Sequence, residues 1–386
     1  MKKIFWVICT SHMFIEVYFL MQVALIPVYI REFRLSLLEV SLVAIIPSLV
    51  QLLMNIPSGF MTDRFNSKYL LFASMMMEGL SALVMSQTRS FWTLVTAVSV
   101  NRISSPLYHI AGLSQISRVS DRDKMSRSIG VHNALGSLGA ALGLASVTVS
   151  LSTVGWRWAY LFWTVPVLAW GFVVLGSPRV ESTRFEKEEA TKKENLPKFL
   201  KVFSIRFVAF LAATGLYLIG TTATSTFMTM YLVKLVGLSE ATASLIFGLG
   251  PFVGILGSLS GGYVGQKTNA KRALGLFIAG CTISLSIMAF SSQLYVLTVI
   301  YAIYMFFSYS VWAPMNTLVA EITPSKERGL SYSVYFFSEG LIASVAPAAA
   351  VAVITAVGIW YVMPFSIIFL LGGLMVLQLL YYPAQS

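Results

Sequence analysis

Four charged side chains lie deep inside long apolar stretches of the sequence, where a charge is typical of ligand binding or proton transfer. They are Glu16, Glu78, Arg102 and Glu339. Each stretch is long enough to cross a bilayer as a helix, and a charge near the bilayer centre costs about 2.5–3.5 kcal/mol. At a rise of about 1.5 Å per residue, each charge lies roughly 14–16 Å from the nearest end of its stretch. Four charges at one depth indicate a binding or proton-transfer site in the middle of a membrane.

Arg102 is the most informative of the four, because a guanidinium keeps its charge even in an apolar environment. It therefore needs a carboxylate or an anionic substrate beside it. The sequence leaves two explanations open: Arg102 acts in transport, or it forms a permanent ion pair with Glu16 or Glu78 that only fixes helix packing. We favour the functional explanation.

Glu16 follows His12 by four residues, so the two side chains share one face of a helix. A carboxylate removed from water can load and release a proton near neutral pH, and histidine titrates in the same range. His109 shares a face with Arg102, seven residues earlier. We therefore predict a proton-coupling site from Glu16, His109 and His12, with hydrogen-bonded structural groups as the alternative.

The two remaining carboxylates receive different predictions. Glu339 could meet a cationic group of a substrate or act as a second proton site, whereas we expect Glu78 to pair inside the first half of the chain. No metal site is expected, because the three histidines lie in separate apolar stretches. The two cysteines each lie inside such a stretch, so we expect no disulfide framework.

The composition is that of an integral membrane protein. Of the 386 residues, 57% are hydrophobic and only 11% are charged, whereas a soluble domain carries about 25% charged residues. We predict an all-α protein with twelve transmembrane helices in two pseudo-symmetric six-helix bundles, with spans at Phe5–Tyr29, Leu37–Phe60, Tyr69–Met85, Phe91–Gln115, Arg127–Leu151, Trp158–Leu175, Arg206–Val233, Ser239–Val264, Ala273–Phe290, Leu294–Val319, Gly329–Thr355 and Trp360–Tyr382.

The basic residues predict the orientation in the membrane. The net charge is +11, and 21 of the 27 Lys and Arg residues lie in loops on one side of the predicted spans. The positive-inside rule places both termini and the central loop in the cytoplasm. A basic surface for nucleic acid is therefore not expected. The apolar run after the first lysines continues to Tyr29 without a small-residue cleavage site, so we interpret it as a retained first helix.

The sequence contains an internal repeat. The stretch 59–68, Gly-Phe-Met-Thr-Asp-Arg-Phe-Asn-Ser-Lys, returns 203 positions later at 262–271, and the same shift pairs residues from Leu35 onward without a gap. A repeat of about half the chain length in a membrane protein indicates a duplicated helical bundle. We predict an N-terminal bundle at 1–177, a charged cytoplasmic linker at 178–205 and a C-terminal bundle at 206–386.

The loop pattern Gly-x-x-x-Asp-Arg-x-x-x-Lys, its weaker copy and the six-plus-six arrangement resemble the major facilitator superfamily of secondary transporters. Within it, the motifs at 12–16, 106–109 and 116–118 look most like the fosmidomycin-resistance type of drug:proton antiporter. Three positions depart from the family pattern. Asn66 stands where Gly is usual, Gln266 replaces the acid of the second copy, and Leu144 stands where the drug antiporters have Pro.

The resemblance implies roles for particular residues. Arg102 would couple transport to protons, and Glu339 would flank the central cavity. The aromatic residues that could line that cavity are Tyr18, Tyr108, Tyr217, Tyr304 and Trp312. The cytoplasmic gate would comprise Gly59, Asp63, Arg64 and Lys68, with Asp63 near the start of the eleventh span, where helix N-terminal amides favour a carboxylate.

We therefore expect a proton-coupled secondary transporter that exports a small drug-like or amphiphilic compound by alternating access. Uptake of a small organic anion bound by Arg102 is one alternative, and a non-transporting sensor or scaffold of the same fold is another. No nucleotide-binding Gly-x-x-x-x-Gly-Lys-Ser/Thr loop occurs. We expect no enzymatic activity and no cofactor, with the proton as coupling ion. The protein is predicted to be a monomer in the cell (inner) membrane. Its expected partners are a small-molecule substrate and the membrane lipids.

Overall fold

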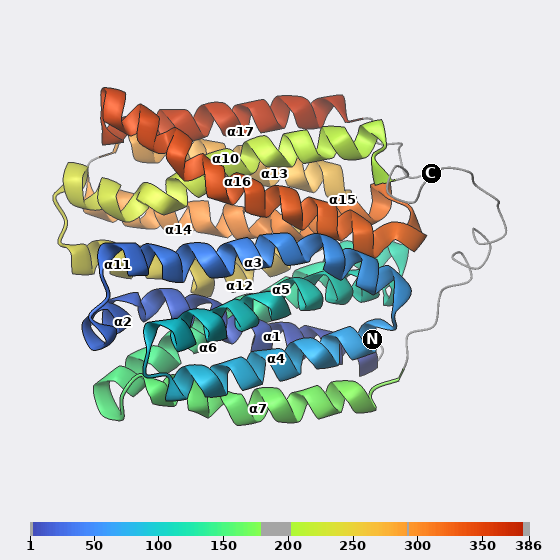
Figure 1. Ribbon diagram of the computed structural model, residues 1–386. Coiled ribbons are helices and arrows are strands. Elements are labelled where there is room, and N and C mark those ends of the chain that lie inside the picture. The colour runs from blue at the N-terminus through green and yellow to red at the C-terminus, as the bar shows by residue number, and fades with distance from the viewer. Residues whose placement is uncertain (1–2, 179–201, 292, 381–386) are drawn as a thin grey trace. The chain divides into compact units, whose positions relative to one another are not determined.

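The computed structural model describes residues 3–178, 202–291 and 293–380, and in these ranges the ordered elements are helices (Figure 1). The first half contains α1 (Lys3–Ala24), α2 (Ile26–Phe33), α3 (Leu37–Arg64), α4 (Ser67–Gln87), α5 (Phe91–Val119), a 3₁₀ turn (Arg122–Lys124), α6 (Met125–Thr153) and α7 (Arg157–Gly176).

The second half has the same plan. It contains α10 (Ile205–Val236), α11 (Glu240–Gly248), α12 (Gly250–Lys267), α13 (Ala270–Ala289), α14 (Leu294–Ser310), α15 (Trp312–Ile322), a 3₁₀ turn (Ser325–Glu327), α16 (Arg328–Val357), a second 3₁₀ turn (Ile359–Tyr361) and α17 (Val362–Leu379).

Eleven helical stretches in the described ranges are long and apolar enough to cross a membrane. The remaining predicted span corresponds to α5, which has 29 residues and carries Arg102 in its interior. The protein is therefore a multi-pass membrane protein, as the composition predicts.

Prolines divide three of the predicted spans into two helices. The break between α1 and α2 falls at Leu25 before Pro27, and the break between α11 and α12 falls at Leu249 before Pro251. The third break, at Val311, precedes Pro314. A proline in a helix removes one backbone hydrogen bond and clashes with the preceding turn. By contrast, α3 continues past its predicted end at Phe60 to Arg64, so Asp63 lies in its last turn and not in a loop.

The helix boundaries extend the repeat over the whole chain. The ends of α5 and α15, Val119 and Ile322, lie 203 positions apart, and so do the ends of α7 and α17. The left-handed residue that follows α2, Arg34 with φ 53°, corresponds at the same shift to Gly237 with φ 76°. The two halves therefore align without an insertion, although each of the three proline breaks occurs in one half only: α10, α3 and α5 are continuous where their counterparts are divided.

The side chains at the helix starts explain part of this regularity. Ser36 and Ser90 each form a capping box with the third residue of the following helix. Asn66 and Asn269, which are equivalent in the repeat, each accept a backbone hydrogen bond at the start of the next helix. These side chains satisfy amide groups that a helix start otherwise leaves unpaired.

Contacts between residues divide the chain into two compact units. Unit 1 comprises 1–121, 135–195 and 324–337, and unit 2 comprises 122–134, 196–323 and 338–386. Each unit thus takes the first turns of one long helix, α6 or α16, from the other half of the sequence. The predicted division at the linker 178–205 stays a prediction, since residues 179–201 of that linker lie outside the described part.

Unit 1 is packed around α5, which contacts α1, α3 and α4, while α4 also packs along α7. Glycines bring α6 close to α1: a Cβ atom on Gly139 would lie 2.0 Å from the carbonyl oxygen of Met13, and one on Gly143 would lie 2.0 Å from that of Val17. In unit 2, α10 packs along α17, and α14 contacts α12 and α13.

Candidate functional site

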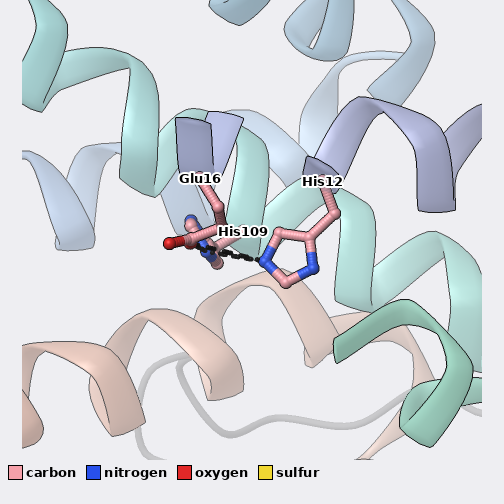
Figure 2. A group of neighbouring side chains, drawn as sticks. All are labelled: His12, Glu16 and His109. Carbon is pink, nitrogen blue, oxygen red and sulfur yellow. Dashed lines mark hydrogen bonds and ion pairs between the residues drawn. The ribbon is translucent and has the colours of Figure 1, made fainter. Parts of the chain in front are cut away.

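Three of the predicted site residues in unit 1 meet at one point. The Nε2 atom of His109 lies 3.0 Å from Oε1 of Glu16 and 3.2 Å from Nε2 of His12, and the His12 nitrogen lies 3.5 Å from the same carboxylate oxygen. Figure 2 shows the three side chains converging from α1 and α5. We call these residues the His–Glu cluster.

Helix geometry and small neighbours position the cluster. His12 and Glu16 lie one turn apart on α1, so they share a face, and α1 packs against the α5 segment that carries His109. Gly136 of α6 leaves room for the His12 ring, because a Cβ atom there would lie 2.4 Å from the ring. Tyr108 stacks on His12 with a centroid separation of 5.5 Å.

The cluster revises one expectation from the sequence. Because the three histidines lie in separate stretches, we expected no metal site. The structure brings His12 and His109 together with Glu16, and their donor atoms all lie within 4.8 Å of one another. His132 takes no part in this group: it lies in the segment of α6 that belongs to unit 2, where its ring contacts Asn133 at 3.1 Å. Helix packing, which the spacing of histidines along the chain does not report, brought the cluster together.

Arg102 forms no ion pair with Glu16 or Glu78. Within the described ranges, no carboxylate lies at ion-pair distance from its guanidinium, which instead lies over the ring of Phe19 at 4.6 Å. The charges of Glu78 and Glu16 act on it from farther away. The structure therefore does not contain the permanent ion pair that the sequence analysis left open, and the half-buried cation lies in unit 1 without a neutralising partner.

Glu78 is held in a polar network inside unit 1. Its side chain is buried and accepts a hydrogen bond from the hydroxyl of Ser104 on α5. Nearby, the Asn101 amide contacts Ser81 and accepts a hydrogen bond of 2.6 Å from Gln22 of α1. These hydrogen bonds join α1, α4 and α5, so the contacts of Glu78 are those of a residue paired within the first half.

Glu339 lies in α16 and belongs to unit 2, where its side chain is half-buried. The His–Glu cluster, Arg102 and Glu78 all belong to unit 1. The predicted role of Glu339 as a second proton site stays a prediction.

The predicted cavity aromatics are mostly inside the helix packing. Tyr18, Tyr108, Tyr217 and Tyr304 are buried, and Trp312 is half-buried. The Tyr108 hydroxyl donates a hydrogen bond of 2.5 Å to the carbonyl of Ile8, and the Tyr217 hydroxyl contacts Ser308. These tyrosines present almost no surface to a ligand in this structure, and their role in a cavity stays a prediction.

The predicted gate residues separate into two groups. Asp63 accepts hydrogen bonds from the backbone N–H groups of Gly329, at 2.8 Å, and Leu330, at 2.9 Å, in the first turn of α16. Gly59 makes this approach possible, since a Cβ atom there would lie 2.6 Å from Cβ of Ser333. All these residues belong to unit 1. They place a carboxylate at a helix N-terminus, which favours negative charge.

The two basic gate residues take no part in this contact. Lys68 donates a hydrogen bond of 3.0 Å to the carbonyl of Ser177 at the end of α7, and Arg64 is exposed. The cation whose charge acts on the Asp63 carboxylate is Arg118, at the end of α5. Arg328 binds the neighbouring Ser117, and its guanidinium donates to the carbonyl and hydroxyl oxygens of that residue at 3.1 and 3.2 Å. Neither arginine was among the predicted gate residues. The position of Arg328 as the first residue of α16, next to the amides that bind Asp63, is the signal that could have identified it.

The sequence of this chain matches a known protein family over nearly its whole length. The family model described as "Major Facilitator Superfamily" matches residues 8–347 and 210–386, which together cover nearly the whole chain. This chain belongs to the Major Facilitator Superfamily. A solved superfamily transporter, FucP in the outward conformation, has the same fold, with a TM-score of 0.80, 11% identity and coverage of 99% of both chains.

Two proteins with similar sequences have names that refer to inorganic anions. The nitrite extrusion protein of Bacillus subtilis is 25% identical over 67% of this chain, and the match spans 64% of the relative's own length. The probable nitrate transporter NarT of Staphylococcus carnosus is 22% identical over 82% of this chain and 80% of its own. The superfamily membership is shown, whereas the narrower fosmidomycin-resistance type is not among these matches.

Proposed function

We propose that this superfamily member is a secondary transporter for a small anion and that Arg102 binds the anion. The observation that carries the proposal is the position of Arg102: a cation in the interior of a membrane-spanning helix, with no carboxylate at ion-pair distance among the described residues. A half-buried cation of this kind attracts an anionic ligand, because an unpaired charge in an apolar environment is costly.

The geometry around Arg102 suits a planar oxyanion. The central carbon of its guanidinium lies over the Phe19 ring at 4.6 Å, and no hydrogen bond or ion pair to a carboxylate occupies its N–H groups among the described residues. Guanidinium binds planar oxyanions through two parallel N–H groups. The names of the two relatives, a nitrite extrusion protein and a probable nitrate transporter, support an anion of this shape.

The repeat provides a second argument. The position equivalent to Arg102 in the second half is Met305 in α14, and the position equivalent to Glu78 is Cys281 in α13. The same helix pattern therefore forms with apolar residues at these places. The charges of the first half are not needed to build six helices, which supports a role in binding.

The energy source and the transport mechanism are proposed from the sequence alone. We propose that the proton gradient drives transport and that the protein works by alternating access. Export of a drug-like compound remains the other candidate substrate class, supported by the resemblance of 106–109 and 116–118 to the fosmidomycin-resistance type. A transport panel can separate the two classes.

The test is flux into proteoliposomes with and without an imposed pH gradient. The panel contains nitrate, nitrite, a small carboxylate and a lipophilic cation. Arg102→Met introduces the side chain found at the equivalent position of the second half, Met305. Arg102→Lys keeps the positive charge but removes the two parallel N–H groups of the guanidinium. Arg89→Met is the matched control, because Arg89 is an exposed arginine between α4 and α5.

We expect the native protein to transport at least one anion. Arg102→Met should lower the initial rate of anion transport at least tenfold, and Arg102→Lys should keep part of that rate. Arg89→Met should transport the anion at the native rate. A tenfold loss corresponds to about 1.4 kcal/mol, close to the lower limit of the roughly 1.5–3 kcal/mol of one charged hydrogen bond. Unchanged anion flux in Arg102→Met would refute the proposal. Flux of the lipophilic cation alone would favour drug export.

A further inference from the structure

We propose that the His–Glu cluster is a binding site for a divalent transition-metal ion of the Zn²⁺ class, with His12, Glu16 and His109 as ligands. Two imidazole nitrogens and one carboxylate oxygen form a ligand set that zinc sites use. The inference concerns a separate group of residues from Arg102 and does not depend on the transport of an anion.

The separations of the three donor atoms fit one bound ion. With distances of 3.0, 3.2 and 3.5 Å, the circle through the three atoms has a radius of about 1.9 Å, and zinc binds such atoms at about 2.0–2.2 Å. An ion lying slightly outside the plane of the three atoms would therefore reach all of them in the observed side-chain positions. The two imidazole rings are nearly perpendicular, at 88°, so they approach the common point without overlapping.

The hydrogen bonds of His109 favour a cation at this point. Its Nδ1 atom lies 2.9 Å from the carbonyl oxygen of Ser105, which can only accept, so Nδ1 carries a proton. In the neutral ring, Nε2 then directs a lone pair toward the Glu16 oxygen and the His12 nitrogen. A carbonyl that fixes the tautomer in this way is the usual partner of a metal-binding histidine.

The alternative occupant is a proton. With a proton on Nε2 of each histidine, both rings could donate to Glu16, but the contact of 3.2 Å between the two ring nitrogens would then join two donors. A metal ion contacts all three atoms together. The compact triangle, in which each atom lies within 3.5 Å of the other two, is therefore better explained by an ion.

The surroundings allow an ion to enter and leave open positions for other ligands. The side chains of Glu16 and His109 keep 21% and 19% of their surface exposed, whereas His12 keeps 8%. Water or another small ligand could complete the coordination from the open side. Two nitrogens and one oxygen suit Zn²⁺, Co²⁺ or Ni²⁺ better than Mg²⁺ or Ca²⁺, which prefer oxygen ligands.

The second half of the repeat has no such group. The equivalents of His12, Glu16 and His109 are Gly215, Ile219 and Trp312. The equivalent segments are also helical, in α10 and at the start of α15. The three ligands are therefore not needed to form helices at these positions. The presence of the cluster in one half alone is consistent with a dedicated binding site.

The experiment is a direct metal titration that requires no transport. Full-length protein in detergent, freed of its affinity tag because tags bind metals, is stripped with a chelator and titrated with Co²⁺ near neutral pH. The visible d–d absorption reports the coordination of Co²⁺, and competition with Zn²⁺ and Mg²⁺ reports selectivity. The variants are His12→Gln, Glu16→Gln and His109→Gln, and the matched control is His132→Gln, which lies outside the cluster.

We expect one equivalent of Co²⁺ with a saturable spectrum, displacement by Zn²⁺ and none by Mg²⁺. Each cluster variant should weaken binding by tenfold or more, while His132→Gln binds as native. Thermal unfolding of the metal-free variants distinguishes a lost ligand from a misfolded protein.

Absence of saturable Co²⁺ binding to the native protein would overturn the proposal and leave a proton as the occupant. The proposal would also be overturned if His132→Gln lost as much Co²⁺ affinity as the cluster variants, or if Mg²⁺ displaced Co²⁺ as well as Zn²⁺ does. Because binding is measured without a membrane gradient, none of these results bears on anion transport by Arg102.

Discussion

The carboxylate of Asp63 accepts a hydrogen bond of 2.8 Å from the backbone N–H of Gly329, at the first turn of α16. A second bond, from Leu330, ends on the other carboxylate oxygen. The last turn of α3 thus caps a helix that lies 266 positions farther along the chain. In the second half, the position equivalent to Asp63 is Gln266, which carries no charge. The charged cap occurs at only one of the two equivalent positions.

Asp63→Asn should weaken this contact, because an amide offers one acceptor oxygen in place of two and removes the charge at the helix N-terminus. We expect a loss of about 0.5–2 kcal/mol in stability, measured as a lower midpoint of thermal unfolding in detergent. Gln266→Ala, at the equivalent position, is the control and should change the midpoint less. A midpoint for Asp63→Asn equal to the native value would contradict the cap.

Gly59→Ala and Gly262→Ala should both destabilise the protein, because each glycine lies against a helix start. A Cβ atom on Gly59 would lie 2.9 Å from the carbonyl oxygen of Gly329, and one on Gly262 would lie 2.8 Å from Cα of Gly130. Overpacking of this kind costs about 1–3 kcal/mol. The measurement is again the unfolding midpoint.

Gly275→Ala provides the control for these two variants, since a Cβ atom there would meet only a side-chain atom of Leu377 at 3.7 Å. Its midpoint should equal the native one. If Gly59→Ala and Gly262→Ala also unfolded at the native midpoint, the close approach at these helix starts would be refuted.

Ser104→Ala should destabilise unit 1, because it removes the hydroxyl that donates to the buried carboxylate of Glu78. A buried acceptor left without its donor costs about 1–3 kcal/mol. Ser99→Ala is the matched control on the same helix, since the Ser99 hydroxyl bonds only to the carbonyl of Val95 one turn earlier. Equal midpoints for the two variants would show that the Glu78 bond contributes nothing specific.

Gly136→Ala tests the arrangement of the His–Glu cluster without changing a ligand. A Cβ atom at this position would lie 2.4 Å from the His12 ring, so the ring must leave the position in which it meets Glu16 and His109. We expect at least a tenfold loss of Co²⁺ affinity in the titration described above. Gly275→Ala should bind Co²⁺ as native, and native affinity in Gly136→Ala would mean that the position of His12 is not critical.

The membrane class, the spans and the repeat follow from the sequence, because each depends on a local property of the chain. The length of an apolar run and the cost of burying a charge do not require knowledge of neighbouring helices. The helix boundaries were predicted less completely. The helix α3 continues to Arg64, and breaks precede Pro27, Pro251 and Pro314, whereas Pro47 and Pro57 lie inside the unbroken α3, so a proline in the sequence does not by itself predict a break.

The positions of Glu16, Arg102 and His109 along their helices could be predicted from the sequence, since such a position is a count of residues along a helix. Their depth in the membrane stays a prediction. Which of them meet could not be predicted. Partners depend on how each helix is rotated about its axis and which helices pack together, and these are decided by contacts between distant segments. The tertiary structure therefore decided that Glu16 meets His109 and His12, while Arg102 lies over Phe19 with no carboxylate of the described ranges at ion-pair distance.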